Sequence, residues 1–149
     1  MLPNDETEQD RLDLYHHIFA LLLGGHLYSV PLDNPRRILD VGTGTGSWAM
    51  DIAEEFPNAQ VIGNDLSPIQ PKWYVSVAAL FEFHALYNFK KWTDMFWEII
   101  IRILPNVTFE VEDAEDPWTY SRNSFDYIHM RSMSGAFENW DAVLRQVFL

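Results

Sequence analysis

Hydrophobic positions along the chain alternate between helical and strand-like spacing. Apolar residues recur every three or four positions between Asp10 and Leu23, which predicts a helix ended by Gly24-Gly25. Short apolar runs predict strands at 38–41, 59–63, 107–111 and 125–130, and helical patterns follow at 48–56 and 141–148. This order is typical of an α/β fold. We expect a mostly parallel, doubly wound sheet with ligands at the carboxyl ends of its strands.

The first predicted strand runs directly into a glycine-rich loop. Gly42, Gly44 and Gly46 are separated by single threonines, and a predicted helix follows them. Glycines at such a strand-to-helix turn let backbone amides approach a nucleotide closely. The dinucleotide fingerprint has two residues between its second and third glycines, whereas this loop has one. The loop therefore favours a nucleotide-type cofactor other than a dinucleotide, with a purely structural turn as the alternative.

Acidic residues near the strand ends indicate which cofactor the loop binds. Asp40 precedes the loop, where a carboxylate repels a pyrophosphate and attracts the ammonium or sulfonium group of S-adenosylmethionine. Asp65 follows the second strand and is expected to accept both ribose hydroxyls, or else to cap the turn at Ser67. After the third strand, we expect Asp113 to bind the adenine amino group while the Ala114 amide binds a ring nitrogen. A solvated acidic turn is the alternative there.

The histidines give no firm catalytic or metal-binding prediction. His129 lies at the fourth strand, where it is expected to line the methyl-transfer crevice, to act as a base, or to be an ordinary wall or core residue. His16 and His17 are neighbours on a helix and therefore point in different directions, which makes them a poor metal pair. We assign no catalytic residue and expect no metal site.

Composition and charge limit the partners. The chain of 149 residues has 22 acidic and 10 basic side chains, and its net charge of −12 opposes direct binding to nucleic acid or to anionic membrane surfaces. Cysteine is absent, which excludes disulfides and cysteine nucleophiles. The N-terminus lacks a secretory pattern, and no run of about 18 uncharged apolar residues occurs. We expect an intracellular protein, cytoplasmic or nuclear, that does not span a membrane.

Four segments carry a family resemblance. Leu-Asp-Val-Gly-Thr-Gly-Thr-Gly at 39–46 and Val-Ile-Gly-Asn-Asp-Leu-Ser-Pro at 61–68 resemble class I S-adenosylmethionine-dependent methyltransferases. Residues 113–120 and 125–131 are similar to the fungal velvet-complex-type regulators of secondary metabolism within that superfamily. The resemblance implies a partial doubly wound, Rossmann-like parallel sheet that lacks the last three strands, and methyl transfer to an unknown acceptor. It also implies cofactor contacts at Asp40, Gly42, Gly44, Gly46, Asp65, Leu66, Asp113 and Ala114.

The same resemblance divides the chain and marks its departures from the family. Residues 1–36 are expected to form an N-terminal helical segment, and 37–149 a partial cofactor-binding domain. Residues 74–103 are an insert, which we interpret as a retained intron or, alternatively, as a genuine helical insertion. Relatives continue into three more strands, so we expect an unpaired fourth strand, low stability and weak or no activity. The alternative function is a non-catalytic protein that keeps the fold and binds a protein partner.

Overall fold

The computed structural model of the protein describes residues 5–70 and 105–148. Its elements follow the expected order of helices and strands, and most ends lie within two residues of the predicted ones. The predicted insert at 74–103 lies outside the described residues. The elements are α1 (Glu6–Leu22), β1 (Arg37–Val41), α2 (Ser47–Glu55), β2 (Gln60–Asp65), β3 (Val107–Val111), β4 (Tyr127–Met130) and α5 (Trp140–Val147).

Helix α1 begins earlier than its apolar pattern predicts. The side chain of Asp5 accepts a hydrogen bond of 2.9 Å from the backbone N–H of Glu8, which makes Asp5 the N-cap. Glu6 and Glu8 in the first turn interact favourably with the positive end of the helix dipole. The predicted start at Asp10 was wrong because these first residues are polar and lie outside the apolar repeat.

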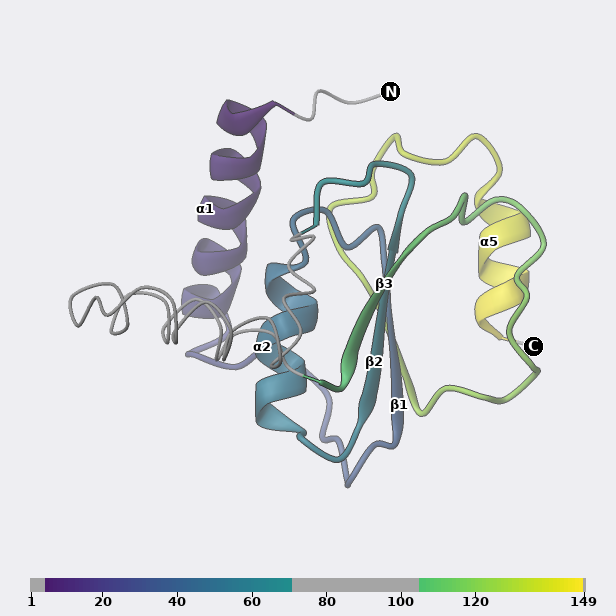
Figure 1. Ribbon diagram of the computed structural model, residues 1–149, viewed down its shortest axis with the longest axis horizontal. Helices are drawn as coiled ribbons and strands as arrows, with labels where there is room; N and C mark the ends of the chain where they lie inside the picture. Colours follow the sequence, from purple (N-terminus) through teal and green to yellow (C-terminus); the bar gives the residue numbers. More distant parts are fainter. Residues whose placement is uncertain (1–4, 71–104, 149) are drawn as a thin grey trace, which may run out of the picture.

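The sheet is parallel, with the strand order β3-β2-β1-β4. Strand β1 lies inside the sheet, where Leu39 pairs with Ile62 on one side and with Ile128 on the other. Figure 1 shows α1 and α2 on one side of the sheet and α5 on the other. The expected doubly wound α/β arrangement is therefore confirmed. In the part of the chain that the structure describes, β4 pairs with β1 alone.

Alternate residues of β1 and β2 point into two apolar clusters, one on each face of the sheet. Ile38 and Val61 pack with Trp48 and Ile52 of α2, and all four are at most 2% exposed. The opposite cluster is built from Leu39, Val41, Ile62 and Ala114. Because both faces are covered, β1 is apolar almost throughout. The exception within this buried strand is Asp40, whose carboxylate is only 3% exposed and therefore needs hydrogen-bond partners.

Within the described ranges, no helix is both long enough and apolar enough to cross a membrane.

Candidate cofactor-binding site

The glycine-rich loop joins β1 to α2 in a conformation that only glycine adopts readily. Gly42, Gly44 and Gly46 have φ angles of 69°, 59° and 84°, in the left-handed region. A Cβ atom at Gly46 would lie 2.6 Å from Cζ of Phe109, and one at Gly42 would overlap the thioether of Met133. The loop is therefore pressed against β3 and against the segment after β4, which explains the glycine requirement by both strain and space.

Asp65 anchors this loop from the end of β2. Its Oδ2 accepts a hydrogen bond of 2.8 Å from the Gly44 amide, and its Oδ1 accepts one of 2.9 Å from the Ser67 amide. The Ser67 contact is the turn-capping arrangement considered from the sequence. An ionised carboxylate has about four lone-pair positions, so these two bonds leave acceptor capacity for further donors. Asp65 thus fixes the loop whether or not it also binds ribose.

Gln70 is a site residue that the sequence pattern did not reveal. Its side chain is 8% exposed, and its Nε2 donates to the carbonyls of Gly44 and Ser67 at 2.8 and 2.9 Å. This buried amide donates to one carbonyl of the glycine loop and to one of the turn after β2, so it holds the two segments together. A single glutamine after a proline-containing turn carries no periodic signal, which is why it was missed.

Asp40 is held in place by both of its oxygens. Oδ2 accepts a hydrogen bond of 2.6 Å from the Thr43 hydroxyl, and Oδ1 lies 2.7 Å from Nδ1 of His129. The His129 ring in turn stacks on Trp48, with centroids 3.7 Å apart and an interplanar angle of 7°. The indole N–H of Trp48 donates to the Leu27 carbonyl at 2.8 Å. His129 thereby orients the Asp40 carboxylate, and it also lines the cavity beside the loop, so its roles in the crevice and in the wall both stay predictions.

A small cavity of about 60 Å³ lies beside the loop. It is formed by α1, the end of β1, the loop, the start of α2 and the segment after β4. Of the predicted cofactor residues, Asp40, Gly42 and Gly44 line it. The remaining lining residues are Leu12, Tyr15, His16, Thr43, Thr45, Ser47, Trp48, His129, Arg131 and Ser132.

The predicted adenine-binding pair lies at the neighbouring strand end. Asp113 accepts a hydrogen bond of 2.9 Å from the Glu115 amide through Oδ1, so it forms the acidic turn considered as the alternative. Ala114 is 7% exposed and packs in the cluster on the opposite sheet face. The Glu112 amide donates to the Asp65 carbonyl at 3.2 Å, which brings the ends of β3 and β2 together. The adenine-binding roles stay predictions.

The other predicted positions differ in exposure. Leu66 is 56% exposed beside Asp65, whereas Gly46 is buried against Phe109. The eight predicted residues therefore lie along one edge of the sheet, around the carboxyl ends of β1, β2 and β3. Asp40, Gly42 and Gly44 share the cavity, and hydrogen bonding connects Asp65 to Gly44.

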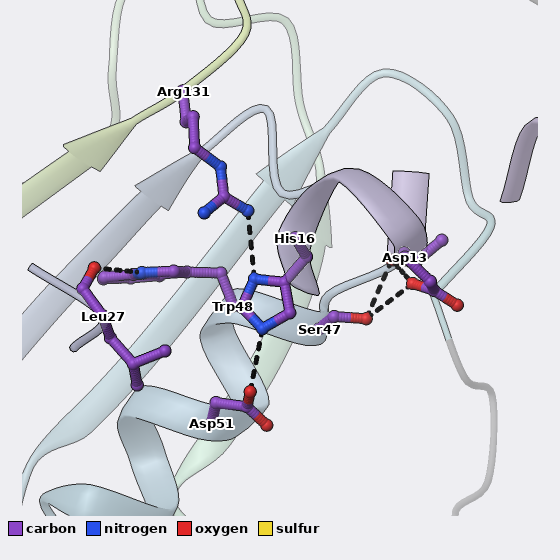
Figure 2. A network of polar contacts seen from close by, with 8 residues as sticks. Asp13, His16, Leu27, Ser47, Trp48, Asp51 and Arg131 are labelled. Carbon is purple, nitrogen blue, oxygen red and sulfur yellow. Dashed lines mark hydrogen bonds and ion pairs between the residues drawn. The ribbon is translucent and has the colours of Figure 1, made fainter. Parts of the chain in front are cut away.

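Polar contacts that the sequence did not predict connect helix α1 to the glycine-rich loop and its neighbours (Figure 2). Oδ1 of Asp13 accepts hydrogen bonds from the hydroxyls of Thr45 and Ser47 at 2.6 and 2.7 Å. One turn later, His16 contacts Oδ2 of Asp51 at 2.8 Å and Nη2 of Arg131 at 3.1 Å. These partners are 32 to 115 residues apart in sequence, so no local pattern marks them.

Among residues 5–70 and 105–148, no group of three or more potential ligands is placed to hold a metal ion.

Comparisons with known proteins agree on the kind of domain. Methyltransferase pytC of Aspergillus terreus is 37% identical over 148 residues, covering 98% of this chain and 36% of pytC. Secondary metabolism regulator LAE1 of Cochliobolus heterostrophus is 36% identical over 153 residues, covering 99% of this chain and 40% of LAE1. The chain thus spans little more than a third of the length of these relatives.

A solved structure shares the fold. Phosphoethanolamine N-methyltransferase 2 of Haemonchus contortus, in complex with S-adenosyl-L-methionine, superposes with a TM-score of 0.56 at 25% identity over 89% of this chain and 25% of that one. A family model described as a methyltransferase domain matches residues 14–149. The class I methyltransferase resemblance is thereby confirmed, and the chain belongs to the methyltransferase-domain family.

Proposed function

We propose that this chain binds S-adenosylmethionine at the carboxyl edge of its sheet and forms the cofactor-binding part of a methyltransferase. The observation that carries the proposal is the buried Asp40 carboxylate beside the left-handed glycine loop, in a chain of the methyltransferase-domain family. A fixed negative charge there attracts a cationic ligand and repels a pyrophosphate. The same feature disfavours a dinucleotide cofactor.

The residues at this edge fit the proposed cofactor in their chemistry. The glycine loop presents backbone without side chains to the cavity at Gly42 and Gly44. Asp65 already accepts hydrogen bonds from two backbone amides, and it would accept further hydrogen bonds from the ribose hydroxyls. Asp113 and the Ala114 amide would hold adenine, and Leu66 would lie beside the adenosyl group.

When bound, the cofactor would supply an electrophilic methyl group on a positively charged sulfur, and the sulfur would leave as the neutral thioether of S-adenosylhomocysteine when the methyl group bonds to the acceptor. The chain's contribution is to orient the cofactor and the acceptor and to exclude water from the site. Asp40 is fixed by Thr43 and His129, and α1 covers the cavity. Positioning two reactants in contact contributes about 7 to 11 kcal/mol, so such a site functions without a dedicated base.

We extend the proposal to the biological setting. The similarity to LAE1, a secondary metabolism regulator, supports a regulatory role in secondary metabolism. For the compartment we propose the cytoplasm or the nucleus. The net charge of −12 makes a protein or small molecule a better acceptor or partner than nucleic acid.

Isothermal titration calorimetry tests the cofactor assignment. The chain is titrated with S-adenosylmethionine, S-adenosylhomocysteine and NAD, and we expect heat of binding with the first two ligands only. Asp65→Ala should weaken both by about 10- to 100-fold, since hydrogen bonds to a charged group contribute about 1.5 to 3 kcal/mol. Asp116→Ala, at an exposed carboxylate of the neighbouring acidic turn, is the matched control and should leave both affinities unchanged.

Preference for NAD over S-adenosylmethionine would contradict the proposal. In a further titration with neutral adenosine, an affinity equal to that of S-adenosylmethionine would also contradict it. Binding of the cofactor without transfer to any acceptor would instead favour a non-catalytic, partner-binding protein with the same fold.

A further inference from the structure

Helix α1 exposes an apolar stripe to solvent. None of the helix residues is buried, and Figure 1 shows α1 at the margin of the molecule. Leu14, Ile18 and Leu21 recur at intervals of four and three residues, so they lie in a row along one face, and Leu22 borders them. Each of these four residues is 40 to 74% exposed. Such a row on one helix differs from the scattered apolar residues of an ordinary surface.

The opposite face of α1 is already in use. Asp13 accepts hydrogen bonds from the hydroxyls of Thr45 and Ser47, and His16 contacts Asp51. This face therefore points toward the glycine loop and α2. The apolar stripe points away from the candidate cofactor site, so the proposed function does not account for it.

Charged residues are confined to the first half of α1. They are Glu6, Glu8, Asp10, Arg11 and Asp13. Residues 14–22 contain no Asp, Glu, Lys or Arg, so the last turn has no cation to interact with the negative end of the helix dipole. Two parallel copies of this helix would bring their acidic halves together. Two antiparallel copies would place each acidic half beside an uncharged half.

We propose that the stripe binds the same stripe of a second copy of this chain, with the two α1 helices antiparallel. The spacing of Leu14, Ile18 and Leu21 is that of a coiled-coil seam. A pair centred on position 16 uses the whole seam, with Leu14 opposite the partner subunit's Ile18. Arg11 then lies opposite the partner subunit's Leu21, where its stem covers apolar surface and its guanidinium supplies the cation that the last turn of the partner helix lacks.

A second copy fits the stripe better than a lipid surface does. Helices that lie on membranes carry basic residues on their polar face, whereas the charged half of α1 has four acidic residues and one arginine.

The size and charge of the pair predict a weak dimer. With 17 residues, α1 is about 25 Å long, so pairing of the helices buries less than the roughly 800 Å² per partner of a standard interface. We expect a dissociation constant on the order of 10 µM. Because both copies carry a net charge of −12, added salt should tighten the dimer.

Sedimentation velocity of the full chain between about 1 and 200 µM measures the association. The unmodified chain should shift from monomer to dimer over this range. Ile18→Glu places a charge near the centre of the pair and should weaken the dimer at least about 10-fold. Phe148→Glu is the matched control, because it introduces the same charge at an 82% exposed apolar residue next to α5, on the other side of the sheet. It should leave the dissociation constant unchanged.

Disulfide cross-linking tests the direction of the helices, because the chain has no cysteine of its own. Chains with Arg11→Cys are mixed with chains with Leu21→Cys and oxidised mildly. Antiparallel pairing brings the two different positions together, so mass spectrometry should find the mixed disulfide in excess over both symmetric ones. Equal positions lie about 15 Å apart along an antiparallel pair, which is too far for a disulfide.

Three results would overturn the proposal. A chain that stays monomeric at about 200 µM does not bind a second copy through the stripe. A dimer that keeps its full affinity in Ile18→Glu uses another surface. An excess of symmetric disulfides, or no disulfide in a dimeric sample, would contradict the antiparallel pairing. None of these results depends on cofactor binding, which the titrations described above test separately.

Discussion

At the scale of single residues, three glycines allow the cost of backbone strain to be measured apart from the cost of steric overlap. Gly135 has a φ of 79° with open space around a Cβ, Gly63 has overlap without a positive φ, and Gly46 has both. We expect Gly135→Ala to lower the free energy of unfolding by about 1 kcal/mol and Gly63→Ala by about 1–3 kcal/mol. Gly46→Ala should cost more than either, because strain and overlap with Phe109 add.

Urea denaturation of the three variants measures this order. Phe109→Leu in the Gly46→Ala background should recover part of the loss, since the ring contact that a Cβ would make is removed. The same substitution in the Gly135→Ala background should recover nothing. Equal costs for Gly46 and Gly135 would show that the close packing of the loop against β3 is absent.

A second residue-level prediction concerns the start of β1. Oδ2 of Asp126 accepts hydrogen bonds from the Arg36 and Arg37 amides at 2.7 and 3.0 Å, and these bonds lower the pKa of Asp126 below its ordinary value of 3.8. A group with a lowered folded-state pKa contributes stability that is present above the unfolded value. That stability is lost as the pH falls through the folded pKa.

Asp126→Asn keeps an acceptor oxygen but removes the charge. At pH 7 the variant should therefore lose up to about 1 kcal/mol of unfolding free energy, a modest figure because the site is exposed. The difference from the unmodified chain should shrink below pH 4 as Asp126 protonates. Denaturant titrations at several pH values measure it, with Asp116→Asn as the exposed control. A difference that stays constant to pH 3 would contradict the assigned cause.

At the scale of elements, α1 stands apart because none of its residues is buried. The polar contacts of Asp13 and His16 therefore carry much of its attachment. Asp13→Ala removes the acceptor that the two hydroxyl groups share. Because this loosens the helix locally, we expect faster hydrogen exchange of α1 amides with little change in the global unfolding midpoint. Asp10→Ala, at an exposed carboxylate of the same helix, should change neither. Unchanged α1 exchange in Asp13→Ala would contradict this attachment.

The elements were predictable because each has a local signal. Apolar runs marked every described strand, and the glycine loop marked the turn between β1 and α2. Contacts between distant segments had no such signal. The chain of contacts from Trp48 through His129 to Asp40 joins α2, β4 and β1, and it depends on the strand order. The contact between His16 and Arg131 depends on where α1 lies across the sheet, which its exposed apolar positions did not indicate.

At the scale of the whole molecule, the central position of β1 determines the site. Parallel pairing on both sides aligns the ends of β2 and β4 with the end of β1, so Asp65, Asp40 and His129 meet at one edge. Their types and order are visible in the sequence. Their hydrogen-bond partners are not, because Asp65 binds loop amides and Asp40 binds a histidine 89 residues away.

The net charge of −12 leads to a prediction for the molecule as a whole. Among the described residues, Glu8–Arg11 is the ion pair between an arginine and a carboxylate, and two further carboxylates contact His16 and His129, so repulsion between carboxylates outweighs attraction. Raising NaCl from about 20 to about 200 mM shortens the screening length to below about 10 Å. We expect the thermal midpoint to rise by about 2–4 °C, equivalent to about 1 kcal/mol.

Differential scanning calorimetry at both salt concentrations measures the shift. KCl at equal ionic strength should act like NaCl, because the effect is screening. The shift should also diminish as the pH approaches the isoelectric point of about 4.6, where the net repulsion vanishes. A midpoint that falls with added salt at pH 7 would show that attractive pairs dominate and would contradict the prediction.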